Sequence, residues 1–96
     1  MSNQLRLKYE CFVPSSLDRQ MYSKNLSMVE DLAPADSYVD YIICKLADGT
    51  YRTIINIRSV CGKFYSEAQG ISPLVSLQQA KKSILNTLED WKKWRF

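Results

Sequence analysis

Histidine is absent from this chain of 96 residues, which removes the side chain that enzymes use most often as a general base. The acidic residues are scattered, without the close DxD or ExxE spacing that would indicate a metal site. The glycines are few, at Gly49, Gly62 and Gly70, and they form no phosphate-binding loop. We therefore predict that the protein is not an enzyme and that it holds no metal and no cofactor.

Cysteine is also scarce, and its three positions, Cys11, Cys44 and Cys61, include no CxxC pair. An odd number without paired spacing gives little support to a disulfide framework or a zinc site. Cys11 and Cys44 fall on apolar positions of predicted strands, where a free cysteine behaves as a small buried hydrophobe. Cys61 is predicted in an exposed turn.

Long apolar runs are missing as well. No segment approaches the roughly 20 apolar residues that cross a bilayer, and the start of the chain lacks the apolar core of a signal peptide. An apolar content of 46% and a charged content of 24% are ordinary for a globular protein. We expect one cytoplasmic domain over residues 1–96, without a membrane segment. The net charge of +3 is too mild to imply a nucleic-acid partner by itself.

Two helices follow from local signals. Residues 4–13 alternate between apolar and polar side chains, which predicts a half-buried strand, and Ser15 is then the expected N-cap of a helix from about Ser16 to Leu32. Ser72 and Pro73 predict the start of a second helix, because proline is favoured at the first helical position. The apolar residues near helical spacing in the first helix are Leu17, Met21, Val29 and Leu32, with Tyr22 and Leu26 beside them. Those of the second are Leu77, Ala80, Ile84, Leu88 and Trp91.

Two turns divide the middle of the chain into three strands, at about residues 37–47, 50–60 and 63–69. Asp48-Gly49 predicts a two-residue hairpin loop, and Cys61-Gly62 a weaker one. With these loops, the face turned to the core carries Ile42, Cys44, Leu46, Tyr51, Ile55, Ile57, Phe64 and Ala68. The opposite face carries Tyr41, Ile43, Lys45, Arg52, Ile54, Asn56, Arg58, Lys63, Tyr65 and Glu67.

The order strand, helix, strand, strand, strand, helix predicts an α+β fold. A first strand joined by a helix to the next normally runs parallel to it. The expected architecture is a two-layer β-α-β-β-β-α sandwich, in which a four-stranded sheet carries both helices on one face. The other face of the sheet would then be open to solvent.

Basic residues gather on two predicted surfaces. The open face combines Phe12, Tyr41 and Tyr65 with six cations against two acids, Glu10 and Glu67. Its cations are Arg6, Lys8, Lys45, Arg52, Arg58 and Lys63. Cations beside aromatic rings suit phosphates and unstacked bases, although a solvated sheet face has the same composition.

The last helix offers the second surface. The pairs Lys81-Lys82 and Lys92-Lys93 are eleven residues apart, almost three turns, which places them on one side about 16 Å apart. Arg95 extends the second pair. Such a bar of charge can straddle phosphates, but it can equally be a solubilising helix flank.

The strand segment from Phe64 to Gly70, followed by the long last helix, resembles the ribosome hibernation promoting factor and ribosome-associated inhibitor family, in which the last strand is similar to F-x-A-E-A-x-G. The resemblance covers nearly the whole chain. It implies a cytoplasmic stress-response protein that binds small-subunit rRNA in the mRNA and tRNA channel, and that inhibits translation or stabilises idle ribosomes. Where typical members are densely basic late in the last helix, this chain has Asn86, Thr87, Glu89 and Asp90.

The resemblance also ranks the candidate RNA-binding residues. The nearest equivalents of the family's basic positions are Lys81, Lys82, Lys92 and Lys93 on the last helix, with Arg19 and Lys24 on the first. Arg95 joins the first group, and Lys45, Arg52 and Arg58 of the open face form a second. Two alternatives stay open: a double-stranded RNA-binding-like module, and a protein-interaction module that forms a homodimer through the open sheet face.

Overall fold

The computed structural model describes residues 4–34 and 36–95. In chain order its elements are β1 (Gln4–Glu10), α1 (Ser16–Leu32), β2 (Tyr38–Lys45), β3 (Tyr51–Ser59), β4 (Gly62–Gly70) and α2 (Pro73–Arg95). This order and the α+β class confirm the fold that the sequence predicts.

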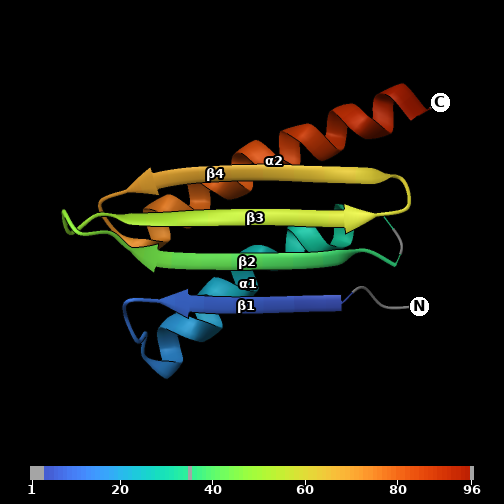
Figure 1. Cartoon of the computed structure of the whole chain (residues 1–96). Coiled ribbons are helices and arrows are strands. Elements are labelled where there is room, and N and C mark those ends of the chain that lie inside the picture. The colour runs from blue at the N-terminus through green and yellow to red at the C-terminus, as the bar shows by residue number, and fades with distance from the viewer. Residues whose placement is uncertain (1–3, 35, 96) are drawn as a thin grey trace.

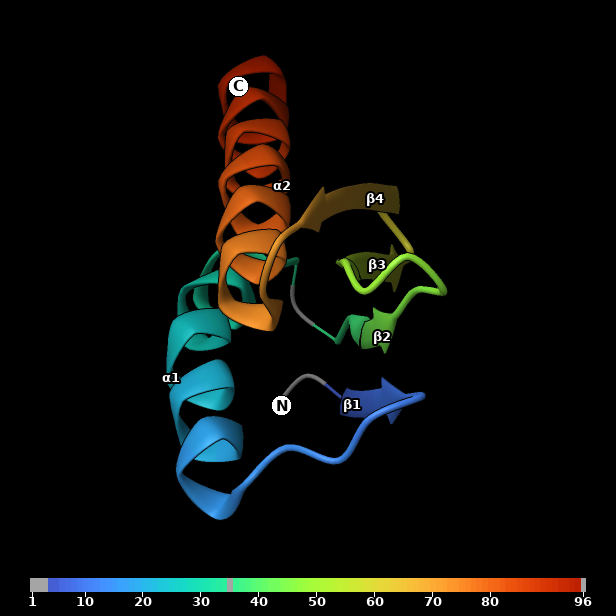
Figure 2. The same ribbon diagram turned by 90° about the vertical axis from the view of Figure 1, so that its left-hand side faces the viewer.

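The four strands form one sheet in the order β1-β2-β3-β4 (Figure 1). β1 runs parallel to β2, and the other neighbours are antiparallel. Both helices lie on one side of the sheet, and the opposite side, called here the open face, carries no element (Figure 2). The helices cross the strands diagonally, so that the start of α1 projects past β1 and the end of α2 projects past β4.

Both helices begin where the sequence predicts. The Ser15 hydroxyl accepts a hydrogen bond from the Asp18 N–H at 3.2 Å and caps α1. At the start of α2, the Ser72 hydroxyl accepts from the Val75 N–H at 3.2 Å, and Pro73 is the first helical residue.

The loop between β2 and β3 differs from the prediction by one residue. Lys45 pairs with Tyr51, and the N–H of Leu46 donates to the Thr50 carbonyl at 2.8 Å, which leaves a three-residue loop. Its last residue, Gly49, has φ +88°, the left-handed conformation expected at the third position of such a loop. The Asp48 carboxylate accepts from the Thr50 hydroxyl at 2.6 Å and from its N–H at 3.0 Å, and these bonds lower the pKa of Asp48.

This one-residue shift turns every side chain of β2 to the opposite face. Val39, Tyr41 and Ile43 are buried beneath the helices, while Ile42 and Cys44 lie half-buried on the open face. The predicted core positions of β2 are therefore wrong. So is the prediction that Tyr41, Ile43 and Lys45 belong to the open face.

The β3–β4 turn also differs, but without changing faces. Ser59 pairs with Gly62, so the loop is Val60-Cys61, and each partner on β4 moves by two residues from the predicted register. Because side chains alternate with a period of two, Phe64 still faces the core.

The end of β1 is the third difference. The strand ends at Glu10, and Cys11 is exposed with φ +64°, so it is not the buried cysteine that the alternation predicts. The turn brings Phe12 to the helix side, where its ring packs against Tyr9 and Tyr51 at centroid distances of 5.7 and 5.3 Å. Phe12 was predicted on the open face.

The core lies between the helices and the sheet. On α1 the buried residues are Tyr22, Leu26 and Val29, whereas Leu17 is 77% exposed, so the inward face is rotated from the predicted stripe. The predicted apolar stripe of α2 is confirmed, because its first four members are buried. Its fifth, Trp91, is half-buried and packs against Phe64, with their ring centroids 5.6 Å apart. The buried apolar residues are Tyr22, Leu26, Val29, Val39, Tyr41, Ile43, Ile55, Ile57, Phe64, Leu77, Ala80, Ile84 and Leu88.

We expect Gly70→Ala to destabilise the protein, because a Cβ at this position would lie 2.8 Å from both the backbone N of Ser76 and the Cγ1 of Val75. A clash with backbone cannot be relieved by a side-chain rotation, so the loss in the free energy of unfolding should be about 1–3 kcal/mol. Urea denaturation measures it. The exposed α2 variant Gln79→Ala is the control and should change stability by less than about 0.5 kcal/mol. Equal stability of the two variants would contradict the prediction.

Candidate functional site

The predicted RNA-binding residues divide between the two sides of the molecule. The helix surface, defined as Arg19, Lys24, Lys81, Lys82, Lys92 and Lys93, lies on α1 and α2. Arg52 and Arg58 lie on the open face, on the side of the sheet away from the helices. One flat ligand therefore cannot contact both groups. Arg95 ends α2, and its side chain lies outside the described residues.

The exposed cations of the helix surface are Arg19, Lys24, Lys82 and Lys93. The last two lie eleven residues apart on α2 and therefore on the same side of that helix. Among the described residues, ion pairs join Lys8 to Glu10 and Arg58 to Asp40. Lys82 and Lys93 thus have no carboxylate partner within the described part of the chain, and Glu89 does not pair with Lys93.

The other two lysines of α2 are less accessible. Lys81 is half-buried, and its ammonium donates to the Asn25 side-chain oxygen at 3.4 Å, which links α2 to α1. Lys92 is also half-buried. Part of the charge on this helix therefore serves the contact between the helices.

An aromatic cluster lies between the sheet and the start of α1. Tyr9 packs against Phe12 and Tyr22, with ring centroids 5.7 and 6.1 Å apart, and Phe12 packs against Tyr51. The Arg19 guanidinium lies over the Tyr9 ring, 5.6 Å from its centroid. Sequence reasoning missed this cluster because it placed Phe12 on the opposite face.

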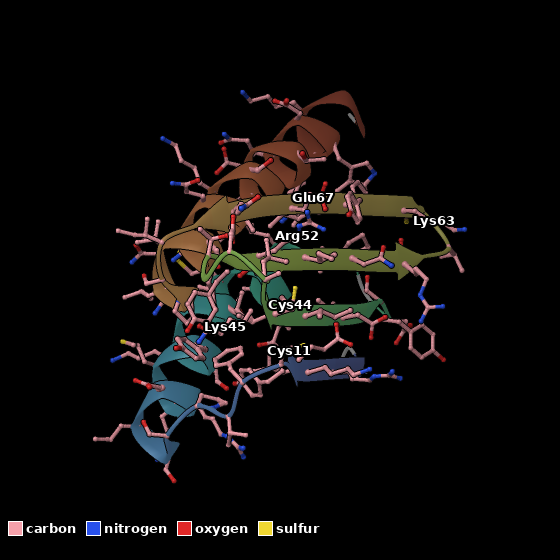
Figure 3. All side chains as sticks on the ribbon, turned by 60° about the vertical axis from the view of Figure 1, so that its left-hand side comes forward. Cys11, Cys44, Lys45, Arg52, Lys63 and Glu67 are labelled. Atoms are coloured by element: carbon pink, nitrogen blue, oxygen red, sulfur yellow. The ribbon has the colours of Figure 1, made fainter. Side chains whose placement is uncertain are left out.

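Lys45 belongs to this side of the molecule. It is the register partner of Tyr51 and shares the face of Ile43, so it is exposed at the end of β2 on the side that carries the helices (Figure 3). The structure therefore removes Lys45 from the open face and places it near the cluster that Arg19 covers.

The open face is less basic than predicted. Its cations are Arg6, Lys8, Arg52, Arg58 and Lys63, and its acids are Glu10, Asp40 and Glu67. The Arg58 guanidinium lies 3.6 Å from the Asp40 carboxylate and 5.6 Å from the centroid of the Tyr38 ring. The Lys8 ammonium lies 3.5 Å from the Glu10 carboxylate on the same strand. Much of the charge on this face is thus balanced locally.

Across residues 4–34 and 36–95, no group of three or more Cys, Asp or Glu side chains is placed to hold a metal ion. None of the helices in the same ranges has the length and hydropathy of a membrane span.

Comparison with known proteins identifies the fold. No protein-family model and no curated protein sequence matches the chain. Among solved structures, the N-terminal domain of Protein Y from Thermus thermophilus superposes with a TM-score of 0.76 and 15% identity, over 93% of this chain and 98% of that one. A ribosomal subunit interface protein from Coxiella burnetii superposes with a TM-score of 0.77 and 11% identity, over 94% and 98%. The chain shares the fold of both proteins.

This likeness includes the first strand. β1 pairs with β2 along its whole length and is an integral part of the sheet. A double-stranded RNA-binding domain has three strands between its two helices and no such strand before them, so the fold does not support that alternative.

Tyr9→Phe should stabilise the protein. The Tyr9 hydroxyl is buried and has no hydrogen-bond partner among the described residues, so its removal relieves an unsatisfied polar group. We expect a gain of about 1 kcal/mol in the free energy of unfolding, measured by urea denaturation at neutral pH. The matched variant Tyr41→Phe removes a hydroxyl that donates to the Leu26 carbonyl at 3.4 Å, and it should lower stability. A loss with both variants would show that the Tyr9 hydroxyl has a favourable partner.

The same variant should alter the response to alkali. Burial raises the pKa of Tyr9 in the folded state, so the unfolded chain ionises first, near pH 10. Folding stability is therefore full below about pH 10 and falls as the pH rises through the folded pKa. Tyr9→Phe should make this fall shallower. Burial raises the pKa of Tyr22 and Tyr41 too, so part of it should remain.

Proposed function

We propose that this protein is a ribosome-associated factor that binds rRNA of the small subunit, near the mRNA and tRNA channel, through its helix surface. Binding there would inhibit translation or stabilise idle ribosomes. The observation on which the proposal depends is the fold, which extends over nearly the whole length of two solved structures, one of them named a ribosomal subunit interface protein.

Exposed charge on the helix surface supports the proposal. Lys82 and Lys93 are solvated cations without a carboxylate partner among the described residues, and their common side of α2 faces away from the sheet. Each can therefore contact a phosphate without first breaking an ion pair. Release of condensed counterions from the RNA would supply most of the binding free energy.

The departures from the family pattern predict modest affinity. Glu89 and Asp90 are exposed on the same helix as the lysines. These carboxylates would lie close to RNA phosphates and weaken binding electrostatically. The proposed complex should therefore form at low salt and dissociate steeply as salt is added.

Cosedimentation with purified small subunits and whole ribosomes tests the proposal directly. Saturable binding to the small subunit at low salt, lost at moderate salt, is the expected result. The slope of the logarithm of affinity against that of salt concentration should be about −0.7 to −0.9 for each phosphate contact. Absence of saturable binding at low salt would refute the proposal.

The double variant Lys82→Glu with Lys93→Glu should lower the affinity for the small subunit at least about tenfold and make the salt dependence shallower by about two contacts. Its matched control is Arg52→Glu with Lys63→Glu, which changes net charge equally but on the open face. That control should bind nearly as well as the unchanged protein. Equal losses from the two pairs would indicate that net charge, and not the helix surface, governs association.

A further inference from the structure

The open face has a regular pattern of charged, aromatic and apolar side chains. The register aligns its residues in four rows that run across β1, β2, β3 and β4. In this strand order the rows are Gln4, Tyr38, Arg58 and Lys63; then Arg6, Asp40, Asn56 and Tyr65; then Lys8, Ile42, Ile54 and Glu67; then Glu10, Cys44, Arg52 and Gln69. The third row has an apolar middle, formed by Ile42 and Ile54.

We infer that the open face binds a second copy of this chain, with the two sheets packed face to face about a twofold axis that runs parallel to the strands between β2 and β3. This axis places β1 of each copy over β4 of the other, and β2 over β3. Each row of one copy then faces the same row of the partner, with the order of the strands reversed. The helix layers of both copies lie outside.

This arrangement brings opposite charges together. Lys8, whose ammonium lies 3.5 Å from the Glu10 carboxylate within its own chain, meets the partner's Glu67 as a second carboxylate, and the symmetry makes the contact twice. Within one chain Lys8 and Glu67 are separated by three strand spacings, about 14 Å, so they cannot pair with each other. Ile42 meets the partner's Ile54 at the centre, where both side chains are half-buried in the single chain. Desolvated apolar contact there would supply the attraction, and the flanking ion pairs would set the register.

The shape of the face fits the same axis. A hollow of about 130 Å³ lies beside β1 and β2, lined by Arg6, Lys8, Asp40, Tyr41, Ile42, Ile54 and Asn56. Opposite Arg6 the axis places the partner's Tyr65, whose side chain is 56% exposed on β4. In the single chain the Tyr65 hydroxyl donates to the Glu67 carboxylate at 3.0 Å, so the ring would exchange this bond for a place in the hollow beside the guanidinium, a contact of the cation–π kind.

Twofold axes that run across the strands bring like charges together as well as opposite ones, such as Arg6 with the partner's Glu10 or Lys63 with the partner's Glu67. An axis across the strands through the third row places Lys8 on Lys8 and Glu67 on Glu67 of the partner. An axis through the second row places Arg6 on Arg6 and Asp40 on Asp40. An axis between these rows places Arg6 on the partner's Lys8. Like charges in direct contact oppose association, so the axis parallel to the strands is the one that the charge pattern favours.

The size of the face predicts a weak dimer. Four strands about 4.8 Å apart and eight residues of about 3.3 Å give a projected area near 500 Å². A typical stable interface buries about 800 Å² per partner, so dissociation in the micromolar range or above is expected. The dimer should therefore depend on protein concentration.

Sedimentation equilibrium of the full chain over a wide concentration range, without ribosomes, is the first test. The unchanged protein should show a reversible monomer–dimer equilibrium. Lys8→Glu and Glu67→Lys should each weaken it about tenfold or more, because each replaces two ion pairs with two like-charge contacts. The double variant, in which the two charges are exchanged, should restore dimerisation.

Mixing the two single variants gives the sharpest test. One chain with Lys8→Glu and one with Glu67→Lys present complementary charges at both contacts, so the mixture should form a heterodimer although neither variant forms a homodimer. The matched control is Lys63→Glu, an equal charge reversal on the same face, two rows away from the contact between Lys8 and the partner's Glu67. This control should dimerise normally.

Three results would overturn the inference. One is a chain that stays monomeric at every concentration. This result includes a monomer whose backbone amide NMR signals on the open face shift only when an RNA oligonucleotide is added. Another is a dimer that tolerates Lys8→Glu. The third is the absence of association between the two mixed variants. Lys82→Glu with Lys93→Glu should leave dimerisation unchanged, so failure here and failure of ribosome binding can be told apart.

Discussion

The loop from Ala47 to Gly49 fixes the register of β2 against β3, and the distribution of side chains between the two layers depends on it. Because Gly49 has the left-handed conformation, the hairpin closes with three residues, and Lys45 pairs with Tyr51. A loop shorter by one residue would turn the side chains of Val39, Tyr41 and Ile43 to the open face. The β2 side chains that now lie on the open face would turn toward the helices. The core beneath the helices and the mixed surface on the other side are thus two results of one backbone conformation.

The sequence predicted the elements far better than the contacts between them. Caps, periodicity and connection rules act locally or through topology. They predict the helix starts at Ser15 and Ser72, the order of the strands and the side of the sheet on which the helices lie. These rules do not determine which side chains of β2 face the core, because Asp-Gly is compatible with loops of two and of three residues. With β2 inverted, Asp40 entered the open face and Lys45 left it, and the predicted excess of positive charge there became much smaller.

The candidate site was predicted in part for the same reason. Lys82 and Lys93 are exposed on α2, as helical spacing requires, since their separation depends on helix geometry alone. The contact between Lys81 and Asn25 depends on how two helices cross, which a single sequence pattern does not encode. The aromatic cluster with Arg19 depends on the turn at Cys11, where φ is positive without a glycine to indicate it. Local rules therefore identify exposed charge, and tertiary packing decides which charges remain available for a ligand.

The diagonal setting of the two helices also affects the edges of the sheet. Unpaired edge strands recruit further strands, and repeated recruitment leads to fibrous aggregates. Here α1 projects past β1 and α2 projects past β4 (Figure 2). The contact of the Trp91 ring with the Phe64 ring holds α2 against β4. A second chain that continued the sheet beside β4 would bring its own helix layer into the space that the end of α2 occupies. The overhanging helix ends therefore act as steric stops, and they protect a small four-stranded sheet from polymerising edge to edge.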